Sequence, residues 1–210
     1  MRVHHVGEVC SIFLTLALAL GLASGCSSPQ GGEREPLLPA VPGVDATQYG
    51  WPEGSVVIEL ENPLATDPDL AVFRRAEGSG RPAVIVIHGW FGNALNPSGN
   101  TLIQEAIGAN AHYLYPNVRG PHTGTDNCCS DVAMADLDSA LRFLSRYADV
   151  EPSQVFFVAA SGGGYTSLCY LMSRDQALGG VRAWVPITNL IAFHDESSGS
   201  PYEDAVRGCT

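Results

Sequence analysis

The sequence contains no lysine: all 11 of its basic residues are arginine, and with 22 acidic residues they give a formal net charge of −11. The arginines are scattered and form no basic stripe of the kind that binds nucleic-acid phosphates. The acidic residues are spread out as well, which indicates a solvated acidic surface and not an interaction tail. We therefore predict a protein that does not bind nucleic acid.

Internal repeats and CxxC pairs are also absent from the 210 residues. A chain of this length without repeats fits one domain with a tail. Metal sites built on cysteine need closely spaced ligands, and His122 is the only histidine near a cysteine cluster. We therefore expect no bound metal.

No apolar run is long enough for a comfortable membrane span. The run from Ser11 to Leu20 follows Arg2 and precedes Ala23-Ser24-Gly25 and then Cys26. This order is typical of an export signal that is removed from the mature chain. A cysteine directly after small residues resembles the bacterial lipoprotein signal, in which that cysteine becomes the lipidated first residue, although Ala23 stands where leucine is usual. Ordinary secretory cleavage nearby, with Cys26 left unmodified, is the alternative.

The resulting organisation is a lipoprotein-type signal peptide over 1–25, a flexible tether over 26–52 and a folded domain over 53–210. The tether is predicted because it is rich in serine, glycine and proline and carries no sustained apolar period. The residue after Cys26 is Ser27 and not aspartate, which favours the outer membrane by resemblance to Gram-negative sorting. We expect an exported protein, anchored by lipid at the cell envelope on the outer membrane or the periplasmic face.

With Cys10 in the signal and Cys26 lipidated, four cysteines remain: Cys128, Cys129, Cys169 and Cys209. Disulfides form readily outside the cytoplasm, and four cysteines allow three pairings. A bond between two adjacent cysteines is strained. Cys169 falls on the buried face of a predicted helix, where a cysteine can also serve as a small apolar residue. The pairing therefore stays open.

After the tether, predicted strands and helices alternate. Short β-branched or apolar runs predict strands, and apolar residues at helical spacing predict helices. The expected strands are 56–60, 70–73, 83–87, 112–115, 155–158 and 181–187, and the expected helices are 101–108, 131–147 and 163–173. This alternation predicts an α/β fold with a mostly parallel sheet and helices on both faces.

The run Ala159-Ala160-Ser161-Gly162-Gly163-Gly164 closely follows a buried strand and opens a helix. That is the context of a nucleophile elbow, a turn so tight that the residues two positions either side of the serine must be small. Ala159 and Gly163 meet this demand, and the Gly162 N–H at the helix start is a candidate donor to an oxyanion. The alternative is a glycine-rich turn that only permits close packing. A phosphate loop is excluded because no Lys-Ser/Thr follows the glycines.

A second loop, His88-Gly89-Trp90-Phe91-Gly92, directly follows the predicted strand at 83–87. The loop after this strand supplies the other oxyanion donor, a backbone N–H, in folds with a nucleophile elbow. We assign that donor to Trp90, with Phe91 as the second choice. His88 is expected to organise the loop by hydrogen bonding and not to act as the catalytic base.

These two loops, together with Asn117-Val118-Arg119-Gly120 and the stretch from Asp149 to Gly164, resemble the α/β-hydrolase superfamily. The pattern is most similar to the prolyl-oligopeptidase-like serine hydrolases and related esterases, and it extends from about Gly54 to Ile187. The resemblance implies Ser161 as nucleophile, a peptide or acyl ester as substrate, and no cofactor, because covalent serine chemistry needs none.

A reactive serine also needs a base and an acid, which in this fold follow it in the order Asp or Glu, then His. The 49 residues after Ser161 contain one predicted strand and one histidine, His194. By resemblance, the acid and the base follow later strands, so we expect a hydrolase domain whose C-terminal strands are missing, with no closing helix and with Asp and His encoded beyond Thr210. The alternative function is a catalytically inactive, lipid-anchored binding or scaffold module.

Overall fold

The computed structural model describes residues 37–96, 100–120, 126, 128–207 and 209. The predicted signal peptide, the lipidation site Cys26 and His122 lie outside the described residues. Within these residues, no helix combines the length and the apolar character that crossing a membrane requires.

A six-stranded sheet forms the centre of the fold, in the order β1-β2-β4-β3-β5-β6. Its two N-terminal strands pair antiparallel with each other and β2 pairs antiparallel with β4, whereas β4, β3, β5 and β6 are parallel neighbours. The strands are β1 (Ser55–Leu60), β2 (Asp69–Arg74), β3 (Ala83–Ile87), β4 (His112–Pro116), β5 (Val155–Ala160) and β6 (Gly180–Trp184). The predicted mostly parallel sheet is confirmed.

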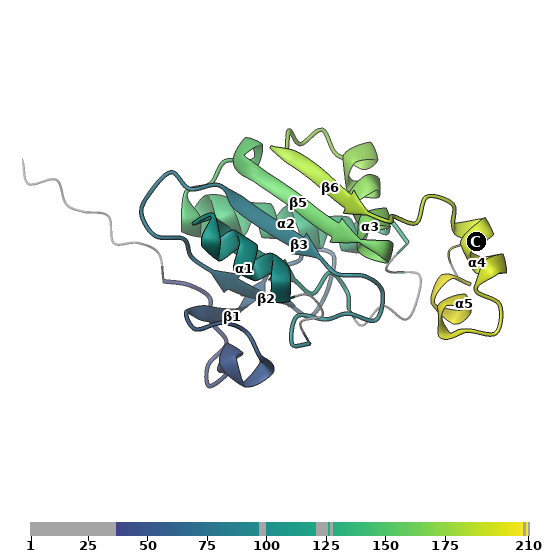
Figure 1. The fold of residues 1–210 in the computed structure, drawn as a ribbon, viewed down its shortest axis with the longest axis horizontal. Helices are drawn as coiled ribbons and strands as arrows, with labels where there is room; N and C mark the ends of the chain where they lie inside the picture. The colour runs from purple at the N-terminus through teal and green to yellow at the C-terminus, as the bar shows by residue number, and fades with distance from the viewer. Residues whose placement is uncertain (1–36, 97–99, 121–125, 127, 208, 210) are drawn as a thin grey trace, which may run out of the picture. The chain divides into compact units, whose positions relative to one another are not determined.

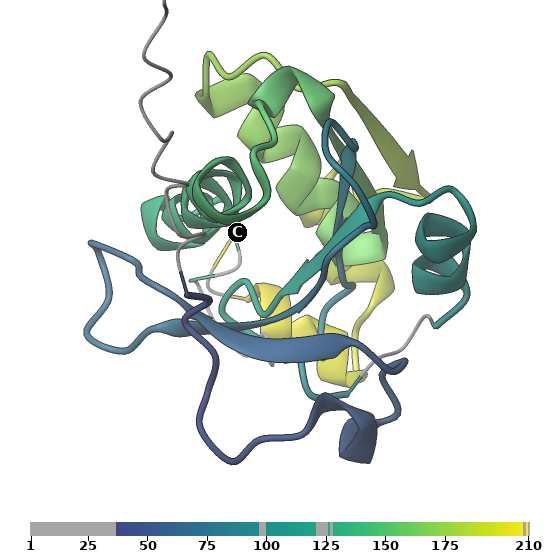
Figure 2. The same cartoon turned by 90° about the vertical axis from the view of Figure 1, so that its left-hand side faces the viewer.

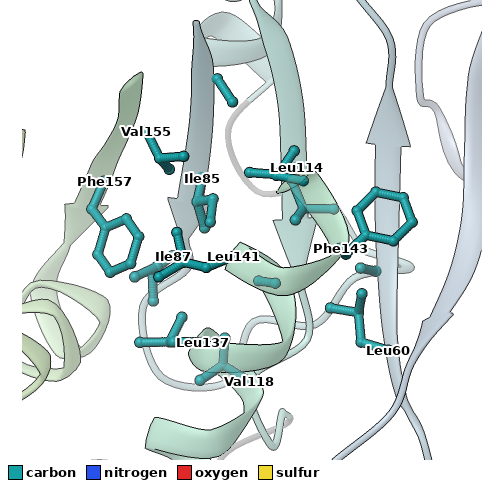
Figure 3. Close-up of a cluster of buried hydrophobic side chains, with 14 of the residues drawn as sticks. Leu60, Ile85, Ile87, Leu114, Val118, Leu137, Leu141, Phe143, Val155 and Phe157 are labelled. Atoms are coloured by element: carbon teal, nitrogen blue, oxygen red, sulfur yellow. The ribbon is translucent and has the colours of Figure 1, made fainter. Parts of the chain in front are cut away.

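Helices cover both faces of the sheet, as predicted (Figures 1 and 2). On one face lie α2 (Asp131–Ala148) and α3 (Ser161–Ser173), and on the other lies α1 (Asn100–Gly108). Figure 3 shows the core under α2, where Leu137 and Leu141 meet Ile87 of β3 and Phe157 of β5. Burying such large aliphatic and aromatic side chains contributes roughly 1.5–3 kcal/mol each. This core fixes the two strands that carry the candidate site loops.

The predicted tether is wrong from residue 39 onward, because this part of the chain packs on the sheet. The Val41 N–H donates to the Val57 carbonyl at 2.9 Å, and a short 3-10 helix follows at Ala46–Tyr49. Trp51 is 3 % exposed, lies against the Tyr115 ring and donates from Nε1 to the Ala94 carbonyl. A tryptophan with its polar tip bonded is a strong anchor, so the folded domain begins before residue 53.

The C-terminal part also differs from the expectation. The last strand ends at Trp184 and not at Ile187, because Val185 has a φ of 41° and Pro186 has no N–H for a ladder. Two short helices then follow where no closing helix was expected: α4 (Leu190–Glu196) and α5 (Pro201–Val206).

Two disulfides settle the pairing that the sequence left open. Cys128 bonds to Cys209 and Cys129 to Cys169. Cys169 is therefore a cross-link as well as a buried residue, with 2 % of its surface exposed. The adjacent pair thus fastens one point, just before α2, both to α3 and to the chain beyond α5.

Candidate active site

Ser161 lies at the turn between β5 and α3, as the sequence predicts. Its φ of 53° places it in the left-handed region, between an extended Ala160 and the helix. This backbone costs a non-glycine residue about 1–2 kcal/mol and persists only where the surroundings enforce it. The serine is half-buried, at the carboxyl end of a central strand. Strain of this kind at a strand-to-helix turn is the geometry of a nucleophile elbow.

The three glycines after Ser161 are each required by a different neighbour. A Cβ on Gly163 would lie 2.3 Å from the Ile87 carbonyl oxygen, and one on Gly162 would lie 2.6 Å from the Trp90 indole. A Cβ on Gly164 would lie 2.9 Å from Cβ of Pro186. The start of α3 is thus pressed against the end of β3, the loop that follows β3 and the loop that follows β6.

The loop after β3 runs directly beside the serine. A Cβ built on Gly89 would lie 3.5 Å from Cβ of Ser161 and 3.9 Å from its Oγ, which is ordinary van der Waals contact. Trp90 is 7 % exposed, with its indole on Gly162, and Phe91 has a φ of 66°. The two predicted oxyanion donors, Gly162 and Trp90, therefore belong to segments in contact next to Ser161.

His88 holds this loop in place. Its Nε2 lies 2.7 Å from the Asn117 carbonyl oxygen and its Nδ1 2.9 Å from the Gly89 carbonyl oxygen. The Asn117 side chain in turn accepts the Ala94 N–H and donates to the Gly120 carbonyl. Burial lowers the pKa of His88, since the charged ring would lose its hydration. These contacts match the loop-organising role that we predict for His88.

An ion network that the sequence does not reveal supports the loop after β4. Arg119 donates to both carboxylate oxygens of Asp136, at 2.6 and 2.9 Å, and lies 3.5 Å from Asp69. Asp69 accepts the Val118 N–H and Asn62 donates to Asp136. Asp136 is fully buried, although carboxylates usually lie on the solvent face of a helix. Burial, with the nearby Asp136 charge second, raises the pKa of Asp69 to about 7.

A cavity of about 270 Å³ lies at the carboxyl ends of β3, β5 and β6, on the face that carries α1. Gly89 and Ala160, which flank Ser161 in space and in sequence, form part of its wall. The remaining lining is mostly apolar: Val86, Ile87, His88, Leu102, Tyr115, Val158, Ala159, Arg182 and Trp184. A small apolar group next to the serine would fit this space.

Among the described residues, no side chain forms a hydrogen bond with the Ser161 hydroxyl. His194 lies on α4, with Nδ1 3.4 Å from a carboxylate oxygen of Asp195. Across the same part of the chain, no group of three His, Cys, Asp or Glu side chains is arranged to hold a metal ion.

The sequence matches no protein-family model and no curated protein. Solved structures do match in three dimensions, and three of them are described here in order of decreasing TM-score. A puromycin-hydrolyzing peptidase from Mycobacterium tuberculosis has a TM-score of 0.61 at 15% identity, over 73% of this chain and 26% of that one. A post-proline cleaving enzyme from Rickettsia typhi has a TM-score of 0.54 at 18% identity, over 74% of this chain and 26% of that one. A protein of unknown function from Agrobacterium tumefaciens, assigned to the α/β hydrolases, has a TM-score of 0.50 at 17% identity, over 62% of this chain and 60% of that one.

The chain spans about a quarter of the length of the Mycobacterium tuberculosis and Rickettsia typhi enzymes. At these identities the likeness concerns the fold. The strand order, the helices on both faces and the strand-turn-helix at Ser161 agree with it. The chain has the α/β-hydrolase fold.

Proposed function

We propose that the protein is a serine hydrolase that cleaves peptide or acyl-ester bonds with Ser161 as nucleophile. The observation that carries the proposal is the left-handed backbone of Ser161, φ 53°, at the carboxyl end of β5. Strained backbone of this kind clusters at active sites, where the surrounding structure enforces it. The names of the structural neighbours, peptidases among them, agree with this reaction class.

The reaction would begin with attack of the Ser161 hydroxyl on a carbonyl carbon. The negative charge that develops on the carbonyl oxygen would be held by the backbone N–H groups of Gly162 and Trp90. Gly162 is the second residue of α3, so the unpaired N–H groups of the first turn and the positive end of the helix dipole favour negative charge there. A base must accept the hydroxyl proton, and an acid must orient that base.

Labelling with a fluorophosphonate, which phosphonylates activated serines, tests the proposal. We expect the folded wild-type protein to be labelled, the modified peptide to contain Ser161, and the Ser161→Ala variant to stay unlabelled. Ser167 is a matched control, because it lies on the same helix but its hydroxyl is buried and donates to the Gly163 carbonyl. Absence of label on folded wild-type protein would overturn the proposal.

A second function is favoured by one specific observation, the lack of any hydrogen-bonded base at Ser161 among the described residues. A chain of this kind would keep the fold as a catalytically inactive binding or scaffold module. In that case the folded protein resists the probe, and Ser161→Ala has the same stability and the same reactivity as wild type.

We also propose that the protein is exported and anchored by a lipid on Cys26. Two disulfides in the folded domain support an oxidising compartment, since cytosolic thiols are kept reduced. Incorporation of radiolabelled palmitate by wild type but not by Cys26→Ser would support the anchor. A mature N-terminus at any other residue would contradict it.

A further inference from the structure

The two short helices α4 and α5 lie beyond the end of β6, at the carboxyl edge of the sheet (Figure 1). Val206 of α5 is fully buried, in a small apolar cluster with Trp90 and Ile187 that Phe193 of α4 joins. Helices of seven and six residues are not stable by themselves. Their place in the fold therefore depends on these contacts.

Aromatic rings connect the helix pair to the loop beside Ser161. Phe193 packs edge-on against Trp90 with ring centres 5.5 Å apart, and Tyr202 of α5 packs edge-on against Phe91 at 5.1 Å. Phe193 and Tyr202 contact each other at 6.0 Å. Such pairs are worth about 0.5–1.5 kcal/mol beyond their buried area. One ring from each helix thus holds one residue of the loop that carries the candidate oxyanion donor.

Two further links fasten the helix pair. The Ile187 N–H, in the segment that leads to α4, donates to the Ser161 carbonyl at 3.4 Å. The disulfide between Cys128 and Cys209 joins the chain beyond α5 to the segment before α2. The helix pair is therefore attached at both of its ends, and at one of them directly to the elbow.

The Trp90 side chain contacts both α3 and α4. Its indole lies on Gly162, where a Cβ would approach to 2.6 Å, and it packs edge-on against Phe193. The next residue, Phe91, has a φ of 66°, a conformation that its surroundings must maintain. Because the backbone N–H of Trp90 moves with this loop, the loop contacts decide where that N–H points.

We propose that the α4–α5 pair, fastened by the Cys128–Cys209 disulfide, positions the Trp90–Phe91 segment as one wall of the oxyanion site, with Phe193 and Tyr202 as positioning residues. This inference rests on the proposed function. It assigns a role in the reaction to a part of the chain that supplies neither the proposed nucleophile nor a proposed oxyanion donor.

The test uses the full chain and the kinetics of fluorophosphonate labelling, which separate probe affinity from the rate constant of phosphonylation. Tyr202→Ala should lower the rate constant about tenfold, a fraction of the ~10²–10³-fold cost of removing an oxyanion donor outright, and leave the affinity unchanged. Tyr202→Phe should restore the wild-type rate constant, because the ring makes the contact. Ile191→Ala on the exposed side of α4, where Ile191 is 66% exposed, is the matched control and should label like wild type.

A second measurement does not need activity. In a chain whose other two tryptophans, Trp51 and Trp184, are replaced by phenylalanine, acrylamide quenching reports the exposure of Trp90. Tyr202→Ala and the double variant Cys128→Ser/Cys209→Ser should both increase quenching, whereas Ile191→Ala should not. Unchanged quenching, or an equal rate constant in Tyr202→Ala and wild type, would overturn the inference. Failure of the wild type to label would overturn the proposed function instead, and the quenching result stands apart from it.

Discussion

Replacing Gly163 by alanine should destabilise the protein strongly, because the glycine seats α3 on the end of β3. The new Cβ would lie 2.3 Å from the Ile87 carbonyl oxygen and 2.4 Å from that of His88. Real Cβ atoms do not approach closer than 3.0 Å, so the helix must move by about 0.7 Å relative to the strand. Both carbonyl oxygens belong to the backbone, one at the end of β3 and one directly after it, so no side-chain rotation can relieve the clash.

Forcing extra atoms into a packed site costs about 1–3 kcal/mol, occasionally more. Since rigid backbone must move, we expect a loss of about 3 kcal/mol in the free energy of unfolding, which for a domain of this size lowers the melting temperature by about 6–12 °C. Urea unfolding followed by circular dichroism, without reductant so that both disulfides stay closed, measures the loss.

Gly108→Ala is the matched control for this substitution. Gly108 ends α1, is exposed and has nothing within 4 Å of the position of its Cβ. Alanine there should raise the free energy of unfolding by up to about 1 kcal/mol, since it has the better helix propensity. A Gly163→Ala variant as stable as wild type within about 0.5 kcal/mol would refute the close seating of α3 on β3.

Two further predictions concern buried charge. Asp136→Ala leaves Arg119 without its bidentate partner, which should lower the free energy of unfolding by about 3–5 kcal/mol. The control Asp175→Ala, at an exposed site, should change it by less than about 0.5 kcal/mol. Equal effects of the two substitutions in urea unfolding would refute the network. Burial lowers the pKa of His88, so below about pH 6.5 the unfolded state binds more protons than the folded state, and the His88 contribution to stability is lost as the pH falls. The stability advantage of wild type over His88→Gln should therefore be larger at pH 7 than at pH 5, and a difference independent of pH would contradict a buried neutral imidazole.

The strands and the turn at Ser161 can be predicted from the sequence because their signals are local. A β-branched run such as 83–87 is strand-forming wherever it lies, and three glycines after a serine mark a tight turn. The helices α4 and α5 were missed, although Asn189 and Ser200 cap them through their side chains. Such capping residues are local signals too, but helices this short also need the cluster around Trp90 to persist.

The features that sequence reasoning misplaced depend on partners far away along the chain. Trp51 is buried because it packs against the Tyr115 ring and donates a hydrogen bond to the Ala94 carbonyl. The proline-rich stretch before Trp51 gives no sign of these contacts. Asp136 is buried because Arg119 arrives from another loop. In both cases the residue type is ambiguous by itself, and the three-dimensional neighbour decides its environment.

The adjacent cysteines Cys128 and Cys129 have a consequence for how the chain folds. Their disulfides close loops with sequence separations of 81 and 40 residues. Exchanging the two partners, Cys169 and Cys209, would change each separation by a single residue, so the loop-closure entropies of the native and the exchanged pairings are nearly equal. Chain entropy therefore does not favour the native pairing over the exchanged one. The choice falls to packing, because α3 and the chain beyond α5 must each already lie beside its own cysteine when the second bond closes.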